Sequence, residues 1–266
     1  MTARRTVTGR LVGMVHLRPL PGSPGYVGSI EDVVADAVAR ARTLADAGFP
    51  ALMVENFGDV PFYADRVPAV TVAAMTRCVE AVKEATGLSV GVNVLRNDVE
   101  SALSVAAATG AQFVRVNVLT GTMFTDQGPI VGRASEVIRL RERLCPDVAI
   151  WADVLVKHAV PPPGLTLEQA AADTWQRGGA DALIVSGSGT GHAPDLDRFE
   201  QVRAAVPHAP LVAGSGADPS NLPEIAARCD HVIVGTYLER EGIPGAPLDP
   251  ERLEAFMGTA RRVGLL

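Results

Sequence analysis

The sequence predicts a (β/α)8 barrel of the TIM type, formed as a single domain by residues 1–266. Short β-branched apolar runs alternate with alanine-rich segments of helical period about eight times along the chain. Links from each helix to the next strand are short and often contain glycine, whereas several links from strand to helix are long and polar. A doubly wound open sheet is the alternative, but it usually has about five or six strands and an early G-x-G-x-x-G motif, which this sequence lacks.

The elements follow from this alternation in chain order. Each apolar run gives a strand, and we expect strands at 11–17, 51–57, 89–95, 113–119, 148–157, 182–187, 210–215 and 231–238. Gly48, Gly87 and Gly110 mark helix ends, because glycine readily adopts the left-handed conformation of a C-cap. The helices are predicted at 30–47, 70–85, 98–109, 133–144, 167–177, 195–205, 220–227 and 249–263. The long strand-to-helix links, 120–132 among them, place the polar residues on the rim at the carboxyl ends of the strands.

The composition excludes several classes of protein. The 24 basic and 30 acidic side chains give a formal charge of −6, and no run of Lys or Arg offers a footprint for nucleic acid. No apolar stretch reaches the roughly 18 residues of a membrane span, and the N-terminal apolar run is too short for a signal peptide. Cys78, Cys145 and Cys229 lie far apart and form no C-x-x-C pair. We therefore expect buried, reduced thiols in a cytoplasmic protein without structural zinc.

Glycine-rich segments at the predicted ends of three strands favour a phosphate site. Glycine lets backbone N–H groups approach phosphate oxygens, and TIM barrels often bind phosphate between the loops after strands seven and eight. The predicted phosphate-binding residues are Gly189, Gly191, Gly214, Ser215, Gly216, Gly235 and Thr236. Tight turns without a ligand are the alternative interpretation.

Polar side chains in the predicted strands point to chemistry at the same rim. Arg115 and Asn117 are two residues apart, so both face the same side of their strand. Glu55 ends an apolar strand, where a carboxylate is rarely buried unless it is paired, and it is a candidate general acid or base. The segment 125–128 either folds over the site as a lid or forms a turn. The predicted substrate-binding residues are His16, Asn93, Arg115, Asn117, Asp126 and His158.

Strand five carries the most informative pair, Asp153 and Lys157, which we expect on one face of the strand. Lys157 is one of two lysines among the 24 basic residues, the other being Lys83 on a predicted helix surface. Lysine can be tuned to act as a base, an acid or an imine-forming nucleophile, whereas arginine keeps its proton at neutral pH. Glu55, Asp153 and Lys157 are therefore the predicted catalytic residues, with a structural Asp153–Lys157 ion pair as the alternative.

Motifs along almost the whole chain resemble the BtpA/SgcQ family. They are GMVHL with PLPGSP, ENFGD, GVNVLRND, RVN, TDQG, ADV with KHA, TG, GSG and GT. The resemblance implies a TIM barrel related to ribulose-phosphate-binding barrels. It also implies a role in photosystem I biogenesis or stability, although much of the family occurs outside photosynthetic organisms.

The residues and the resemblance lead to two functional hypotheses. The first is an enzyme that acts on a small phosphorylated metabolite, a sugar phosphate or a phosphoribosyl compound, by N-glycosidic cleavage or by lyase or isomerase acid–base chemistry. The second is a non-catalytic biogenesis factor, which would need an exposed docking surface. We predict no cofactor, no metal and no nucleic-acid partner, and we expect a homo-oligomer, because such barrels often pair through their helices.

Overall fold

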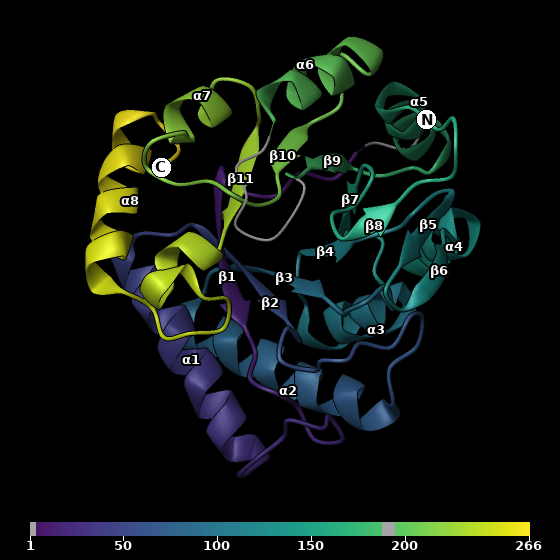
Figure 1. The fold of residues 1–266 in the computed structure, drawn as a ribbon. Helices are drawn as coiled ribbons and strands as arrows, with labels where there is room; N and C mark the ends of the chain where they lie inside the picture. The colour runs from purple at the N-terminus through teal and green to yellow at the C-terminus, as the bar shows by residue number, and fades with distance from the viewer. Residues whose placement is uncertain (1–3, 188–194) are drawn as a thin grey trace.

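The computed structural model describes residues 4–187 and 195–266, where eight parallel strands close into a barrel (Figure 1). Around the ring the strands follow the order β1-β11-β10-β9-β7-β4-β3-β2. They are β1 (Leu11–His16), β2 (Ala51–Glu55), β3 (Ser89–Asn93), β4 (Phe113–Val116), β7 (Ala149–Asp153), β9 (Ala182–Val185), β10 (Leu211–Ala213) and β11 (His231–Val234). The predicted barrel is confirmed, because every neighbouring pair in this ring is parallel.

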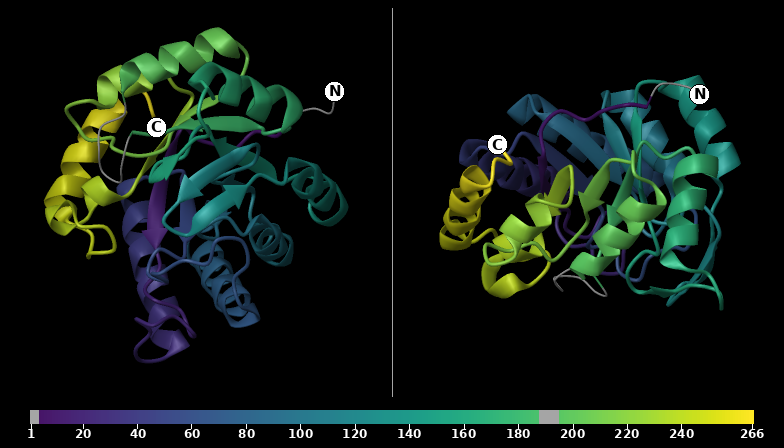
Figure 2. Two further views of the ribbon diagram at one scale, coloured as in Figure 1. Left: turned by 45° about the vertical axis from the view of Figure 1, so that its right-hand side comes forward. Right: turned by 90° about the horizontal axis from the view of Figure 1, so that it is seen from above.

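Helices cover the outside of the barrel, as the two views in Figure 2 show. They are α1 (Ile30–Ala47), α2 (Ala69–Thr86), α3 (Val99–Thr109), α4 (Ala134–Leu144), α5 (Leu167–Ala172), α6 (Leu196–Ala205), α7 (Leu222–Ala226) and α8 (Pro250–Arg262). A π-helical turn at Asp173–Arg177 continues α5, and 3-10 turns at Thr236–Leu238 and Arg240–Gly242 follow β11. The local chemistry explains the limits of α1, which begins at a capping box between Ser29 and Asp32 and ends at left-handed Gly48.

Side-chain alternation along the strands separates two apolar layers. Outward-facing residues such as Val15 and Val54 pack with the helices, whereas Met53, Phe113 and Trp151 fill the barrel interior. Because side chains two residues apart face the same way, the interior continues upward into a polar layer at the carboxyl ends of the strands. This polar layer contains His16, Glu55, Asn93, Arg115 and Asp153, all of which are buried.

Three predictions about loops and strands are wrong. The strand expected at 231–238 ends at Val234, and residues 236–238 form a 3-10 turn instead. The strand expected at 148–157 ends at Asp153, because Leu155 and His158 adopt left-handed backbone conformations with φ of 51° and 56°. Lys157 therefore lies on a loop and does not share a strand face with Asp153. The segment 120–132, expected as a long loop, forms a β-hairpin. This hairpin pairs with residues 159–160, which follow the loop that contains Lys157.

That hairpin consists of β5 (Thr122–Thr125) and β6 (Gly128–Val131), and β8 (Ala159–Val160) pairs with β5. Met123 and Ile130 are cross-strand partners on its buried face, where they pack with Val118 and Val156. The turn at 125–128 thus has a rigid support, and it places Asp126 beside the barrel mouth.

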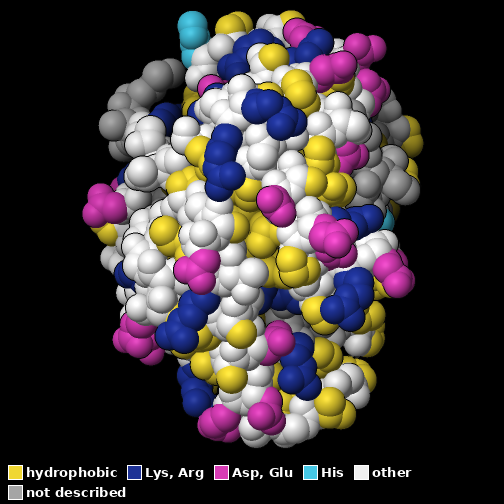
Figure 3. Space-filling view, turned by 90° about the vertical axis from the view of Figure 1, so that its left-hand side faces the viewer, with side chains coloured by type: hydrophobic (Ala, Val, Ile, Leu, Met, Phe, Trp, Pro, Cys, Tyr) yellow, Lys and Arg dark blue, Asp and Glu magenta, His cyan; other side chains and the backbone are white. Residues whose placement is uncertain are grey.

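The outer surface carries charges of both signs. On the face shown in Figure 3, basic and acidic side chains are interspersed with apolar ones. Within residues 4–187 and 195–266, no helix combines the length and the apolar character needed to cross a bilayer.

Candidate active site

A cavity of about 720 Å³ opens at the carboxyl ends of the barrel strands. It gathers twelve of the sequence-predicted site residues on its wall: His16, Glu55, Arg115, Asn117, Asp126, Lys157, His158, Gly214, Ser215, Gly216, Gly235 and Thr236. Asn93 and Asp153 lie behind these residues and hold them in place. Gly189 and Gly191 fall outside the described residues.

Strand register places His16, Glu55 and Asn93 side by side on β1, β2 and β3. The Asn93 amide donates a 2.5 Å hydrogen bond to Oε2 of Glu55, and Nε2 of His16 lies 3.8 Å from Oε1 of the same carboxylate. Glu55 is therefore oriented by an amide on one side and faces an imidazole on the other. Such an arrangement can move a proton between carboxylate, imidazole and a bound ligand.

His16 is held from behind by two residues that were not predicted. Its Nδ1 lies 2.9 Å from Oε1 of Glu239, which also accepts a 2.7 Å hydrogen bond from Nη1 of Arg40. Glu239 is fully buried, and its Oε2 accepts a bond from the Gly245 backbone. A carboxylate at Nδ1 fixes the imidazole ring and leaves Nε2 directed at Glu55. The sequence gives no sign of this contact, because residues 16 and 239 meet only when the barrel closes.

Asp153 is occupied by neighbouring donors. Arg115 donates to both of its carboxylate oxygens at 2.9 Å, Asn117 donates to Oδ2 at 3.2 Å, and Ser186 donates to Oδ1 at 3.4 Å. Burial works against the charge of Arg115, but the Asp153 carboxylate holds the pKa of Arg115 above its ordinary value. A carboxylate in this bidentate pair orients the guanidinium toward the cavity.

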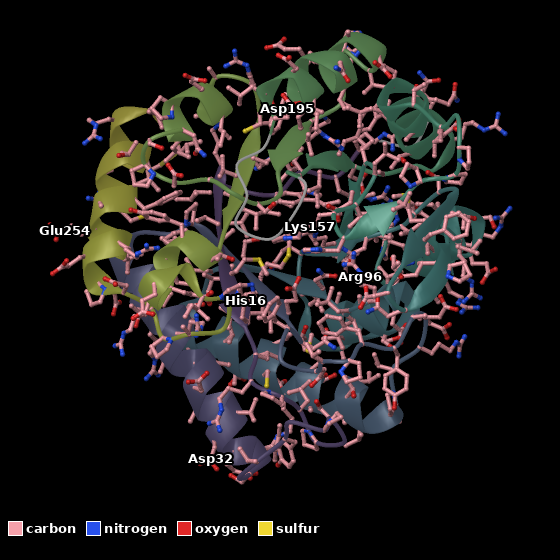
Figure 4. The ribbon with its side chains drawn as sticks, in the orientation of Figure 1. His16, Asp32, Arg96, Lys157, Asp195 and Glu254 are labelled. Carbon is pink, nitrogen blue, oxygen red and sulfur yellow. The ribbon has the colours of Figure 1, made fainter. Side chains whose placement is uncertain are left out.

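Lys157 and Arg96 enter the cavity from the loops after β7 and β3, and Figure 4 shows both near the middle of the barrel mouth. Arg96, which was not predicted, donates from Nη2 to the Lys157 carbonyl oxygen at 2.7 Å. Burial lowers the pKa of Lys157 to about 8, and the nearby Arg115 guanidinium adds to this effect. An amine with this pKa is partly neutral near physiological pH and can act as a base or nucleophile.

The glycine segments after β10 and β11 form the opposite wall. A Cβ at Gly214 would lie 2.4 Å from Ile184 Cγ2, and one at Gly235 would lie 2.9 Å from Cε1 of His16. Close packing therefore explains both glycines without a ligand. Between them, Gly216 adopts a left-handed φ of 76°, and the buried Ser215 hydroxyl has no hydrogen-bond partner among the described residues.

Arg252 of α8 adds a positive charge to this wall, and it was also missed by sequence reasoning. Its guanidinium stacks 5.0 Å from the ring centroid of Tyr237 and donates to the Tyr237 carbonyl oxygen at 2.9 Å. The wall thus combines an arginine, a free hydroxyl and glycine backbone, which are groups that bind phosphate. Among the described residues, no cluster of three or more His, Cys, Asp or Glu has metal-binding geometry.

Comparison with known proteins confirms the resemblance found in the sequence. The sequence model of the BtpA family matches residues 8–262. The photosystem I biogenesis protein BtpA of Synechocystis sp. is 45% identical over 247 residues, which cover 93% of this chain and 86% of that protein. The sgc region protein SgcQ of Escherichia coli is 29% identical over 250 residues, covering 93% of this chain and 92% of that protein.

Solved structures show the same architecture at low sequence identity. Phosphoribosyl anthranilate isomerase from Thermus thermophilus superposes with a TM-score of 0.58 and 17% identity, covering 96% of this chain and 99% of that one. At this level of identity the likeness concerns the fold.

Proposed function

The chain belongs to the BtpA family, and from that premise and its cavity we propose an enzyme that acts by acid–base chemistry on a small phosphorylated metabolite. The observation that carries this proposal is the convergence of Glu55, His16 and Lys157 on one cavity. The glycine segments after β10 and β11, here called the glycine wall, line the same cavity. A titratable amine, a carboxylate and an oriented imidazole in one cavity are typical of proton-transfer sites. The phosphoribosyl enzyme that shares the fold supports this substrate class by analogy.

The phosphate would bind at the wall formed by Ser215, Gly216, Thr236 and Arg252. Ser215 offers an unused hydroxyl, and Arg252 keeps guanidinium donors beyond the one that Tyr237 occupies. This placement directs the rest of the ligand across the barrel mouth toward Glu55 and Lys157. Asn117, whose Oδ1 has no partner among the described residues, would accept a hydrogen bond from a ligand hydroxyl.

The geometry favours lyase or isomerase chemistry over N-glycosidic cleavage. Glycosidic cleavage usually needs two free carboxylates beside the sugar, and Glu55 is one candidate. Asp153 has both oxygens bound by Arg115 and its neighbours, so it serves as a positioning residue. Lys157 instead has a reactive amine: its neutral Nζ adds to a substrate carbonyl carbon, and loss of water gives an imine.

A thermal-shift series with ribose 5-phosphate, ribulose 5-phosphate and inorganic phosphate tests the substrate class. A ligand at about 100 times its dissociation constant should stabilise the protein by about 2.7 kcal/mol. Arg252→Gln should weaken the binding of every phosphorylated ligand. Arg139→Gln, at an exposed position, is the matched control and should leave binding unchanged. Unchanged melting with all phosphorylated compounds would contradict the proposal.

Borohydride reduction distinguishes the two uses of Lys157. Reduction of an imine with ribulose 5-phosphate should leave a secondary amine on Lys157, and mass spectrometry can assign it because Lys83 is the only other lysine. Lys157→Arg keeps the positive charge and should give no adduct. Turnover without an adduct in the native protein would assign Lys157 to proton transfer.

A biogenesis factor is the second candidate, because the Synechocystis relative carries that name. The outer face of the β5–β6–β8 sheet, with Phe124, Val131 and Val160 each about half exposed or more, is an available docking surface. Stoichiometric capture of a protein partner that Phe124→Ser abolishes, together with no thermal shift by phosphorylated compounds, would favour this function.

A further inference from the structure

Among the described residues, two cations in the cavity have no carboxylate in direct contact. Arg96 is 7% exposed and Lys157 is half-buried, and neither lies within 4.0 Å of an Asp or Glu oxygen in the described part of the chain. The nearest acceptor that the structure gives to Arg96 is the Lys157 carbonyl oxygen, a neutral group. Burying a cation without a counter-charge is costly, so a pair of such cations in a cavity calls for an anion from outside.

The acidic residues around the cavity are already committed to other groups. Asp153 is bound by Arg115, and Glu55 is bound by Asn93 and faces His16. Asp126 at the hairpin turn accepts a bond from the neighbouring Gln127 side chain. These carboxylates attract Arg96 and Lys157 from a distance, but among the described residues none of them lies in direct contact with either cation.

The ring order places Arg96 across the barrel from the glycine segment 214–216, whereas Lys157 follows β7, two places from β10, and meets Arg96 through its carbonyl oxygen. Arg96 follows β3, and β3 stands four places from β10 in the eight-membered ring, so it lies diametrically across the barrel from the segment containing Gly214 to Gly216. Arg96 and the glycine segment 214–216 line the same cavity. A ligand that reaches both must span the barrel mouth.

We propose that Arg96 and Lys157 form a second anion-binding subsite, so that the substrate carries an anionic group at the end opposite its phosphate. This inference rests on the proposed function for the position of the phosphate. The second group is a carboxylate or a second phosphate, both of which suit a guanidinium beside an ammonium. An anion bound there favours the charged form of Lys157, which burial and Arg115 disfavour in the empty cavity, so with such a substrate Lys157 serves in proton transfer and not as the imine-forming nucleophile.

A set of six-carbon probes without an aldehyde or ketone group tests this subsite by calorimetric binding. Sorbitol 6-phosphate has one phosphate, 6-phosphogluconate adds a carboxylate at the other end, sorbitol 1,6-bisphosphate adds a phosphate, and gluconate has only the carboxylate. We expect at least one of the two doubly anionic probes to bind about tenfold or more tightly than sorbitol 6-phosphate. The better of the two identifies the second group.

Arg96→Gln and Lys157→Gln should each reduce that preference to within about threefold, while binding of sorbitol 6-phosphate remains. Lys83→Gln removes the same charge at the opposite end of the barrel and should keep the full preference. The preference in the native protein is measurable even if one variant does not fold.

The outcomes separate this inference from the proposed function. Equal affinity for sorbitol 6-phosphate and both doubly anionic probes overturns the second subsite and remains consistent with phosphate binding at the glycine segments. If gluconate binds, Arg96→Gln abolishes this binding and sorbitol 6-phosphate does not bind, the second subsite is supported and the proposed phosphate position is overturned. No binding of any probe at a concentration on the order of 10 mM overturns both.

Discussion

Lys157 shows at the scale of single residues what composition can and cannot reveal. Its rarity in an arginine-rich chain marked it for attention, and the structure places it in the cavity. Its backbone was predicted wrongly, because apolar Val154, Leu155 and Val156 extend the strand pattern while Leu155 turns left-handed. Arg96, Arg252 and Glu239 were missed because their surroundings come from distant parts of the chain.

Lys157 should lower stability in a way that depends on pH. Its pKa is about 8 in the folded chain against the ordinary 10.5, so between these values the unfolded chain binds more protons and stability rises with pH. Below pH 8 the folded state bears the full penalty of the buried charge. Lys157→Gln should therefore stabilise the protein by roughly 1–3 kcal/mol at pH 7, and this gain should fade toward pH 10.5.

Urea unfolding at intervals from pH 7 to pH 10 measures this difference. Lys83→Gln is the control, because Lys83 donates to the carbonyl oxygens of Thr109 and Gly110 and its loss should destabilise the protein. A Lys157→Gln effect that stays constant across the whole range would show that the amine is not perturbed.

The Arg115–Asp153 pair should be sensitive to the loss of one partner. Asp153→Leu leaves a buried guanidinium without its two 2.9 Å bonds and should cost about 3–5 kcal/mol. The double variant Arg115→Met with Asp153→Leu should recover most of this loss, because no buried charge remains. Equilibrium unfolding of the two variants checks the expectation, which fails if Asp153→Leu is as stable as the native protein.

At the scale of elements, periodicity predicted most of the fold. The limits of α1 matched because Ser29 and Gly48 carry explicit capping chemistry. The β5–β6 hairpin was missed, although Thr122 to Val131 alternates across a short turn at left-handed Gly128. The polar layer could be anticipated in part, because Glu55 ends an apolar strand and Arg115 shares one strand face with Asn117.

Two glycine-to-alanine substitutions should have opposite effects. Gly214 follows β10, where a Cβ would lie 2.4 Å from Ile184 Cγ2, so Gly214→Ala should cost about 1–3 kcal/mol. Gly258 lies inside α8, where a Cβ would meet only the end of Arg262 at 3.9 Å, so Gly258→Ala should gain about 0.5–1 kcal/mol. Melting temperatures that shift in the same direction would contradict this contrast.

At the scale of the whole molecule, the three free cysteines report on cooperativity. Cys78 in α2, Cys145 after α4 and Cys229 after α7 are all buried at separate places around the barrel. Burial raises the pKa of Cys78 and Cys229 to about 12 and also raises that of Cys145. A thiol reagent at pH 8 should therefore react with none of them in the folded protein.

Mass spectrometry after exposure to denaturant shows whether the barrel opens as one unit. If it does, the three thiols become reactive over the same urea range, because each is protected by the same closed ring. Early reaction of Cys229 alone would instead show local opening near α7. Serine replacements at single positions assign the signals.

The pairing of β1 with β11 has a consequence for how the protein is made. Residues 11–13 pair with residues 232–234, so the ring stays open until residue 234 has left the ribosome. The contact between His16 and Glu239 joins residues 223 positions apart and forms only after that. Until then a nascent chain exposes the edges of an unclosed sheet, so closure of the ring both covers these edges and assembles the site.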